Sequence, residues 1–101
     1  MANTERFLEY GKLMIDILGR VVYVDNKEIF LTRMEFDVLY FLASNPNIAF
    51  TKEQIYEAVS KDNYTEAAYI IKNVIYQLRN KLGIKNIQTL HSYGYKFLKE
   101  I

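Results

Sequence analysis

The chain has 101 residues, of which half are hydrophobic and 15% are aromatic. This length and composition suit one domain with a single core. No cysteine is present, so disulfide frameworks and thiolate metal sites are excluded. No apolar run reaches membrane-spanning length, and residues 1–7 lack the apolar core of a signal peptide. We therefore expect a cytoplasmic protein without a membrane partner.

The net charge of +1 is unevenly distributed along the chain. Residues 1–50 hold five Lys and Arg against seven Asp and Glu, whereas residues 51–101 hold eight against five. A polyanionic partner such as nucleic acid is compatible with the basic C-terminal half, but so small an asymmetry does not require one.

The N-terminal third alternates short apolar and polar runs that are rich in β-branched and aromatic side chains. Turn residues separate the runs at Gly11, Gly19 and Asp25-Asn26. This pattern predicts a small antiparallel meander of three or four strands, at residues 7–10, 13–17, 21–24 and 28–31. We expect it to act as a lid over the helices and as a docking surface for a neighbouring domain.

Two capping boxes predict the starts of two helices. Thr32 with Glu35, and Thr51 with Gln54, place side-chain oxygens where they satisfy free backbone N–H groups at a helix N-terminus. The first helix carries an inner apolar stripe and ends before Pro46, which disfavours the α conformation at the residue preceding it. Its stripe is Phe36, Leu39, Leu42 and Ala43.

The segment between these helices and the region after the second one are predicted to be connectors. Residues 48–50 form a short extended link before the second helix, which passes through Ile55, Ala58 and Val59. Residues 61–65 are a polar connector to the next helix.

The stretch from Glu66 to Leu82, closed by Gly83, predicts a third helix with two different faces. The inner face is apolar: Ala67, Ile71, Val74, Ile75, Leu78 and Leu82. The outer face holds Tyr69, Lys72, Asn73, Tyr76, Gln77 and Asn80. It has no carboxylate, so its side chains can donate hydrogen bonds to phosphate oxygens and base edges without repelling them. On this helix alone, an ordinary amphipathic helix with a solvated face is an equal alternative.

Residues 87–90 and 95–98 predict two strands around the turn 91–94, in which Gly94 is expected to adopt a positive φ. Two helices joined by a short connector and followed by a hairpin form a winged helix-turn-helix. The predicted fold is one α+β domain over residues 1–101. It comprises an N-terminal four-stranded antiparallel sheet within residues 7–31, a three-helix core at 32–83 and a β-hairpin wing at 86–98.

Three segments, residues 31–59, 78–83 and 87–97, together resemble the C-terminal effector domain of OmpR/PhoB-type response regulators. Each motif is weak alone, but they occur in the family's order and spacing. The resemblance implies a bacterial transcription factor of a two-component phosphorelay. Its implied partners are promoter double-stranded DNA, a second copy on direct-repeat sites, RNA polymerase and a phosphorylated receiver domain. We expect no receiver domain within residues 1–101, and the sequence leaves open whether one precedes them.

The resemblance also implies which residues contact DNA. They are the outer face of the third helix, its neighbour Arg79, and the wing residues Thr89 and His91: Tyr69, Lys72, Asn73, Tyr76, Gln77, Arg79, Asn80, Thr89 and His91. Arg79 matches the Arg of the family's Leu-Arg pair, near the phosphates, although a structural ion pair for it stays open.

Several positions depart from the family pattern. Tyr69, Gln77 and His91 stand where relatives commonly have Arg, Val74 replaces a His, and Ser60 replaces a Trp. Fewer cations predict weaker binding, and Gln and Asn predict a preference for A·T pairs. Tyr95 and Phe97 keep the pattern and are expected to be core residues.

An enzyme is not expected, because the sequence has no Gly-rich phosphate loop and no nucleophile placed beside a base. The single histidine, His91, is too few for a histidine metal site or a catalytic triad. We therefore predict no catalytic residue, no metal and no cofactor. The competing hypothesis is a winged helix used for protein contacts, in dimerisation or RNA polymerase docking, with weak or no DNA binding.

Overall fold

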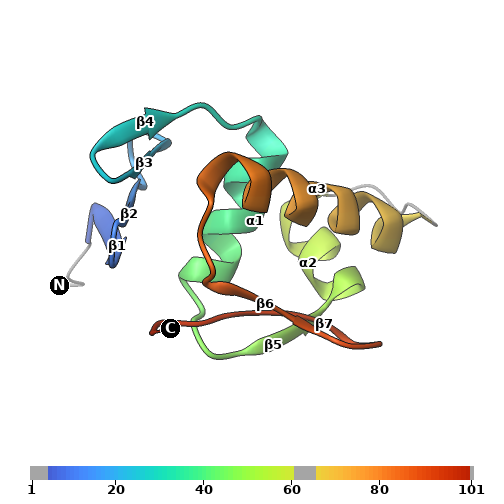
Figure 1. The fold of residues 1–101 in the computed structure, drawn as a ribbon. Helices are drawn as coiled ribbons and strands as arrows, with labels where there is room; N and C mark the ends of the chain where they lie inside the picture. The colour runs from blue at the N-terminus through green and yellow to red at the C-terminus, as the bar shows by residue number, and fades with distance from the viewer. Residues whose placement is uncertain (1–4, 61–65, 101) are drawn as a thin grey trace, which may run out of the picture.

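In a computed structural model of the protein, residues 5–60 and 66–100 form two antiparallel sheets flanking three helices (Figure 1). The elements in order are β1 (Phe7–Tyr10), β2 (Leu13–Asp16), β3 (Val21–Val24), β4 (Lys27–Ile29), α1 (Arg33–Ala43), β5 (Ala49–Thr51), α2 (Lys52–Val59), α3 (Ala67–Leu82), β6 (Ile87–Leu90) and β7 (Gly94–Phe97). The predicted fold class is confirmed. The connector predicted at residues 61–65 lies outside the described residues.

Strands β1 to β4 form the predicted four-stranded meander, which we call the platform. Its turns use the residues that the sequence marked: Gly11 has φ 59°, and Asp25 and Asn26 have φ 54° and 66°. Two successive residues in the left-handed region suit a tight hairpin between twisted strands. The fourth strand is shorter than predicted, because residues 30 and 31 lie beyond its end.

The turn between β2 and β3 is held by one carboxylate. Asp16 accepts two hydrogen bonds from the Arg6 guanidinium, at 2.9 and 3.0 Å, and a third from the Gly19 N–H at 3.0 Å. The hydrogen bonds from Arg6, followed by that from Gly19, lower the pKa of Asp16. A side chain at residue 19 would approach an Asp16 oxygen to 2.6 Å, so glycine suits this turn.

Specific contacts join the platform to the helices. The Tyr10 hydroxyl donates to the Ala43 carbonyl at 2.7 Å, and the Tyr10 ring packs 4.9 Å from that of Phe97. At the other end, Arg20 forms an ion pair with Asp37 at 2.9 Å while its guanidinium lies 4.4 Å from the Phe36 ring. These contacts fix the platform against α1.

Both capping boxes are present. The Thr32 hydroxyl accepts from the Glu35 N–H at 3.2 Å, and a Glu35 carboxylate oxygen accepts from the Thr32 N–H at 2.8 Å. Thr51 and Gln54 make the same reciprocal pair at 3.0 and 2.8 Å. The predicted inner stripe of α1 is entirely buried.

The wing differs from the predicted hairpin, because its sheet has three strands in the order β5-β7-β6. The predicted extended link before α2 is in fact β5, and it pairs with β7 so that Phe50 lies opposite Tyr95. The second wing strand begins at Gly94, one residue earlier than predicted. The start of α2 is therefore tied to the wing.

The prediction of a positive φ at Gly94 is wrong. The left-handed residue of this turn is Ser92, with φ 59°, and Gly94 is the first residue of β7. Glycine is required there for another reason. A Cβ at residue 94 would collide with the carbonyl oxygen of Phe50 on the adjacent strand, so the close approach of β5 excludes any side chain.

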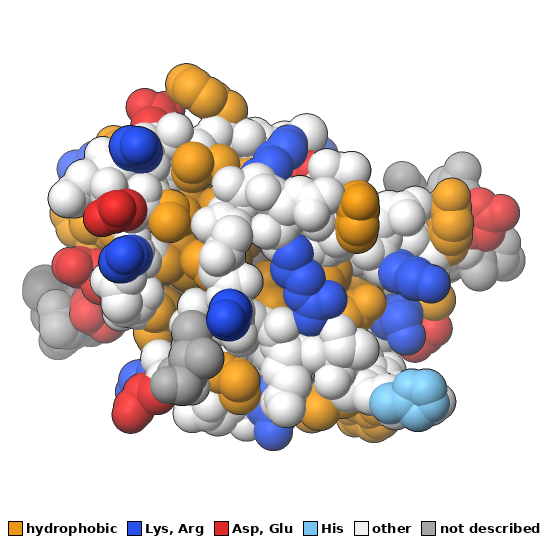
Figure 2. Space-filling model, in the orientation of Figure 1, with side chains coloured by type: hydrophobic (Ala, Val, Ile, Leu, Met, Phe, Trp, Pro, Cys, Tyr) orange, Lys and Arg blue, Asp and Glu red, His pale blue; other side chains and the backbone are white. Residues whose placement is uncertain are grey.

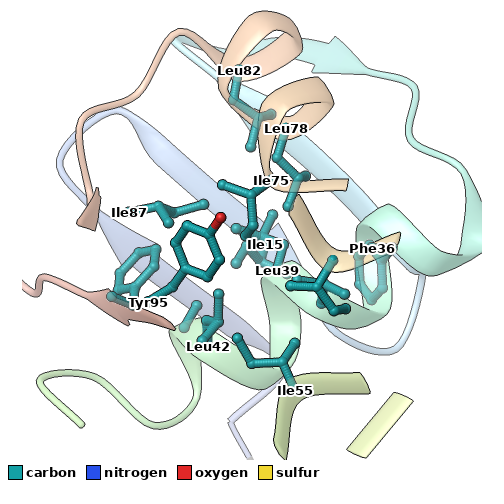
Figure 3. Close-up of a cluster of buried hydrophobic side chains, with 14 of the residues drawn as sticks. Ile15, Phe36, Leu39, Leu42, Ile55, Ile75, Leu78, Leu82, Ile87 and Tyr95 are labelled. Carbon is teal, nitrogen blue, oxygen red and sulfur yellow. The ribbon is translucent and has the colours of Figure 1, made fainter. Parts of the chain in front are cut away.

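The core brings together side chains from the platform, all three helices and the wing (Figure 3). The inner face of α3 supplies Ala67, Ile71, Ile75, Leu78 and Leu82, all buried as predicted. Val74 is only partly buried and packs at the edge of the core. Tyr95 and Phe97 are 4% and 0% exposed, which confirms that they are core residues.

The burial of Leu78 and the exposure of Gln77 predict a sharp contrast between neighbours. Leu78→Ala should lower the free energy of unfolding by about 2–5 kcal/mol through lost burial and a cavity. Gln77→Ala, at an exposed helical position, should change it by about 0.5 kcal/mol or less. Urea melts of both variants measure this, and equal losses would contradict the orientation of α3.

Candidate nucleic-acid interface

The helix α3 owes its defined C-terminal end to Gly83. This residue adopts the left-handed conformation, with φ 63°, and its N–H donates to the Arg79 carbonyl at 2.9 Å. Arg79 and Lys81 lie in the last turn, where positive charge is favoured by the helix dipole. The N-cap residue Glu66 makes no side-chain capping hydrogen bond.

All six predicted outer-face residues of α3 are exposed: Tyr69, Lys72, Asn73, Tyr76, Gln77 and Asn80. The two phenol side chains stand out most, with Tyr69 65% and Tyr76 62% exposed. Within α3 itself there is no acidic residue. In Figure 2, basic side chains lie along α3 and between α3 and the wing. The structure therefore presents, on α3 and the wing, separate basic groups interspersed with exposed tyrosine and amide side chains.

Arg79 joins α3 to the wing. Its Nη2 donates to the Ile87 carbonyl at 2.7 Å and to the Thr89 hydroxyl at 2.8 Å. The guanidinium also lies 5.8 Å from the centre of the Tyr95 ring. Within residues 5–60 and 66–100 it forms no ion pair, so its structural role is a hydrogen-bonded bridge to β6. Two predicted site residues, Arg79 and Thr89, thus contact each other directly.

The wing tip holds the last predicted site residue. His91 is exposed, and it follows β6 directly in the turn that leads to β7. The pale-blue histidine in Figure 2 lies at the far end of the wing. Tyr93 in the same turn is 48% exposed. The tip therefore presents an exposed imidazole and a half-exposed phenol.

Sequence reasoning missed Lys52, the first residue of α2. Its Nζ lies 5.8 Å from the centre of the Tyr95 ring, so two cations, Lys52 and Arg79, approach the same ring. Burial raises the pKa of Tyr95, and the charge of Arg79 opposes this rise. Only the pairing of β5 with β7 brings Lys52 here, and no signal near residue 52 indicates that pairing.

The C-terminal half of α3 is also fixed to α1. Lys81 Nζ donates to a Glu35 carboxylate oxygen at 2.7 Å, and this same oxygen accepts from the Thr32 N–H. Burial of the carboxyl opposes its ionisation, but the hydrogen bonds from Lys81 and Thr32 outweigh it and lower the pKa of Glu35. One carboxylate therefore caps α1 and holds α3 in place.

Comparison with known proteins identifies this arrangement. Residues 26–97 match the family described as transcriptional regulatory protein, C terminal. The chain belongs to this family. The effector domain is 39% identical over 86 residues to the transcriptional regulatory protein VxrB of Vibrio cholerae, covering 85% of this chain and 35% of VxrB. This family match, together with the solved structure of an OmpR/PhoB homologue, confirms the resemblance to OmpR/PhoB-type effector domains.

Solved structures agree with this assignment. The response regulator DrrB of Thermotoga maritima, an OmpR/PhoB homologue, superposes with a TM-score of 0.85 at 28% identity, covering 94% of this chain and 45% of DrrB. The DNA-binding domain of CpxR from E. coli superposes with a TM-score of 0.81 at 26% identity, covering 93% and 97% of the two chains. The effector domain spans less than half the length of VxrB or DrrB.

Two further findings concern the described residues alone. None of the helices within residues 5–60 and 66–100 is long and apolar enough to cross a membrane. The same residues contain no group of three or more His, Cys, Asp and Glu side chains that could hold a metal ion.

The lowered pKa of Glu35 predicts a pH-dependent contribution to stability. Because this pKa is below its ordinary value of 4.5, the carboxylate stabilises the fold fully above that value and loses its effect as the pH falls through the folded-state pKa. Glu35→Gln keeps an acceptor oxygen but removes the charge. We expect the variant to be less stable at about pH 7 and the difference to narrow towards about pH 3.

Urea melts over this pH range measure the difference between the two free energies of unfolding. Asp16, whose pKa is also lowered, is present in both proteins, so its contribution cancels. A difference that stays constant with pH would contradict an ionised, hydrogen-bonded Glu35.

Proposed function

We propose that the effector domain binds promoter double-stranded DNA in a sequence-specific way and regulates transcription. The outer face of α3 would enter the major groove, and the wing turn at residues 91–94 would lie at the backbone or in the minor groove. The observation that carries this proposal is the exposed, carboxylate-free outer face of α3, which Arg79 connects to the wing. The likeness to the DNA-binding domain of CpxR supports it.

The residues divide into two proposed roles. Lys72, Tyr69 and Tyr76 carry ammonium and phenol groups suited to phosphate oxygens, which fix the position of a protein on DNA. Gln77 and Asn73 carry amides, which pair with the N6 and N7 edge of adenine. Asn80 lies further along the same face, towards the C-terminal end of α3. Thr89 and His91 extend the contact to the wing.

The proposal extends to the whole protein through its relatives. We propose a homodimer on direct-repeat sites, with a receiver domain and RNA polymerase as partners in a bacterial cytoplasm. The interface described above binds and positions groups, and the proposal assigns it no catalytic step and no cofactor.

A winged helix used for protein contacts is the second candidate. The exposed aromatic side chains Tyr69 and Tyr76 favour it, as do the Tyr, Gln and His at positions where the family resemblance implies Arg. Exposed tyrosines are frequent in protein interfaces. Absence of duplex binding at low salt would favour this candidate, because electrostatic DNA binding strengthens as salt is removed.

Salt titrations distinguish phosphate contacts from other roles. If Lys72 neutralises a phosphate, Lys72→Ala should weaken binding equally for all DNA sequences and reduce the slope of log K against log salt by about one. Lys27→Ala, an exposed lysine on the platform, is the matched control and should leave the slope unchanged. A sequence-selective loss for Lys72→Ala would assign this residue to base contacts instead.

The same titrations test the position of Arg79, whose guanidinium already bonds to Ile87 and Thr89. A phosphate contact by its remaining N–H groups requires a slope change of about one in Arg79→Ala. Weaker binding with an unchanged slope would mean that Arg79 acts only by holding the wing.

Gln77 is predicted to specify the preferred base. Its amide offers one acceptor and donors that match adenine, whereas the two parallel donors of Arg match guanine. Gln77→Arg should shift the preference at one position from adenine towards guanine by about 1–3 kcal/mol. Its added charge should also strengthen binding to all sequences. Selection from randomised duplexes with both proteins gives the two half-sites.

Identical half-sites from the two proteins would show that Gln77 does not face the base edges. Gln77→Ala serves as the control, since it removes the amide without adding charge. It should lose the adenine preference and keep the rest of the site.

A further inference from the structure

A hollow of about 510 Å³ lies between the platform and the C-terminal end of α3. Its lining comes from the turn between β1 and β2, the end of β3, the link from α3 to β6, and residues 99 and 100. None of the proposed DNA contacts lines it. In Figure 2 an apolar strip runs between the platform and the end of α3, with basic side chains beside it. We call this hollow the platform pocket.

The floor of the platform pocket is apolar. Leu13 is buried in the core, and Val24 and Ile84 are partly buried and pack against it. The polar groups of two other lining residues are already engaged, because the Tyr10 hydroxyl donates to Ala43 and the Asn86 amide donates to the Leu98 carbonyl. An occupant would therefore be held at the floor by apolar contact.

The rim of the platform pocket is cationic. Lys12, Lys85 and Lys99 are exposed and stand against one carboxylate, Glu100. Within residues 5–60 and 66–100, none of these three ammonium groups forms an ion pair or a side-chain hydrogen bond. Three such cations around an apolar floor favour a ligand with a negative end.

The walls are formed by backbone of defined conformation. Gly11 and Gly83, on opposite sides of the pocket, both adopt the left-handed conformation, with φ 59° and 63°. Each of them closes a tight turn, one between two paired strands and one at the end of α3. A pocket with preformed walls loses little entropy when it is filled.

We propose that the platform pocket binds a small amphipathic organic anion, a carboxylate carried on an apolar chain or ring. The apolar part lies on Leu13, Val24 and Ile84, and the carboxylate lies at the lysine rim. The volume is within the range of small-molecule sites, roughly 300–1,000 Å³. This inference is independent of the proposed DNA binding, since the two sites share no residue.

The ligand contacts both the platform and the end of α3, so it links two parts of the fold that are separate in sequence. A ligand that binds only the folded state raises the melting temperature, and the rise grows with the logarithm of ligand concentration above its dissociation constant. Octanoate is the probe for this test, because it combines one carboxylate with an apolar chain.

The test is a titration of isotope-labelled protein with octanoate, followed by amide chemical shifts and by the melting temperature. The expected result is saturable shifts at Gly11, Gly83 and Ile84 together with a higher melting temperature. Octylammonium, of equal chain length and opposite charge, should bind at least about tenfold more weakly. Equal binding of the two, or equal shifts with acetate, would overturn the proposal.

A charge-reversal pair supplies the matched variants. Lys85→Glu should weaken octanoate binding by about tenfold or more, while Lys72→Glu, the same change on α3 outside the pocket, should leave it unchanged. If Lys85→Glu fails to fold, Lys12→Gln takes its place. Equal losses in the rim variant and in Lys72→Glu would overturn the proposal.

A second copy of this chain is the other possible occupant. Shifts at the same amides that grow with protein concentration, without octanoate, would assign the platform pocket to a contact between copies and overturn the small-anion proposal.

Discussion

The burial of the inner face of α3 is the constraint on which the candidate interface depends. Successive helical residues are separated by about 100°, so fixing Ile71, Ile75 and Leu78 in the core leaves no freedom in which side chains face outward. Sliding this apolar stripe by one residue would bury Lys72 or Gln77 and expose a large aliphatic group. Core packing, rather than any contact on the outer face, therefore determines which residues a partner meets.

Two polar contacts also hold the C-terminal half of α3 against its neighbours. The Lys81 contact with Glu35 holds the C-terminal half of α3 against the start of α1, and Arg79 holds it against β6. Both lie within the last turn of α3, so this end is fixed from two sides while its first turn has no side-chain cap. The wing is fixed from its other edge as well, because β5 pairs with β7 and leads directly into α2. A partner thus meets a surface whose two elements are already positioned relative to each other.

Sequence reasoning succeeded where the signal is local and failed where it is not. The boxes at Thr32 and Thr51 act over three residues, and the faces of α3 follow from helical periodicity, so both could be predicted. The pairing of β5 with β7 joins distant segments, and nothing around residues 48–50 distinguishes a strand from an extended link. Gly94 illustrates the consequence of missing this strand pairing. A glycine in a turn indicates a positive φ, but this one serves the close approach of Phe50, which only the third strand explains.

The same distinction applies to the electrostatics of the interface. The sequence identified Lys72 and Arg79 as cations of the third helix. It could not show that one guanidinium nitrogen of Arg79 donates hydrogen bonds to Ile87 and Thr89 of the wing. Nor could it show that Lys52 and Arg79 both lie near the Tyr95 ring. Within residues 5–60 and 66–100, the outer-face cation Lys72 forms no ion pair, whereas Arg79 and Lys52 both contact the wing. Since counterion release grows with the number of phosphates neutralised, so sparse a set of charges would give the proposed DNA binding a shallow salt dependence. In the proposed DNA complex, discrimination would then rest more on the amides of Asn73 and Gln77, whose hydrogen bonds depend on base identity and little on salt.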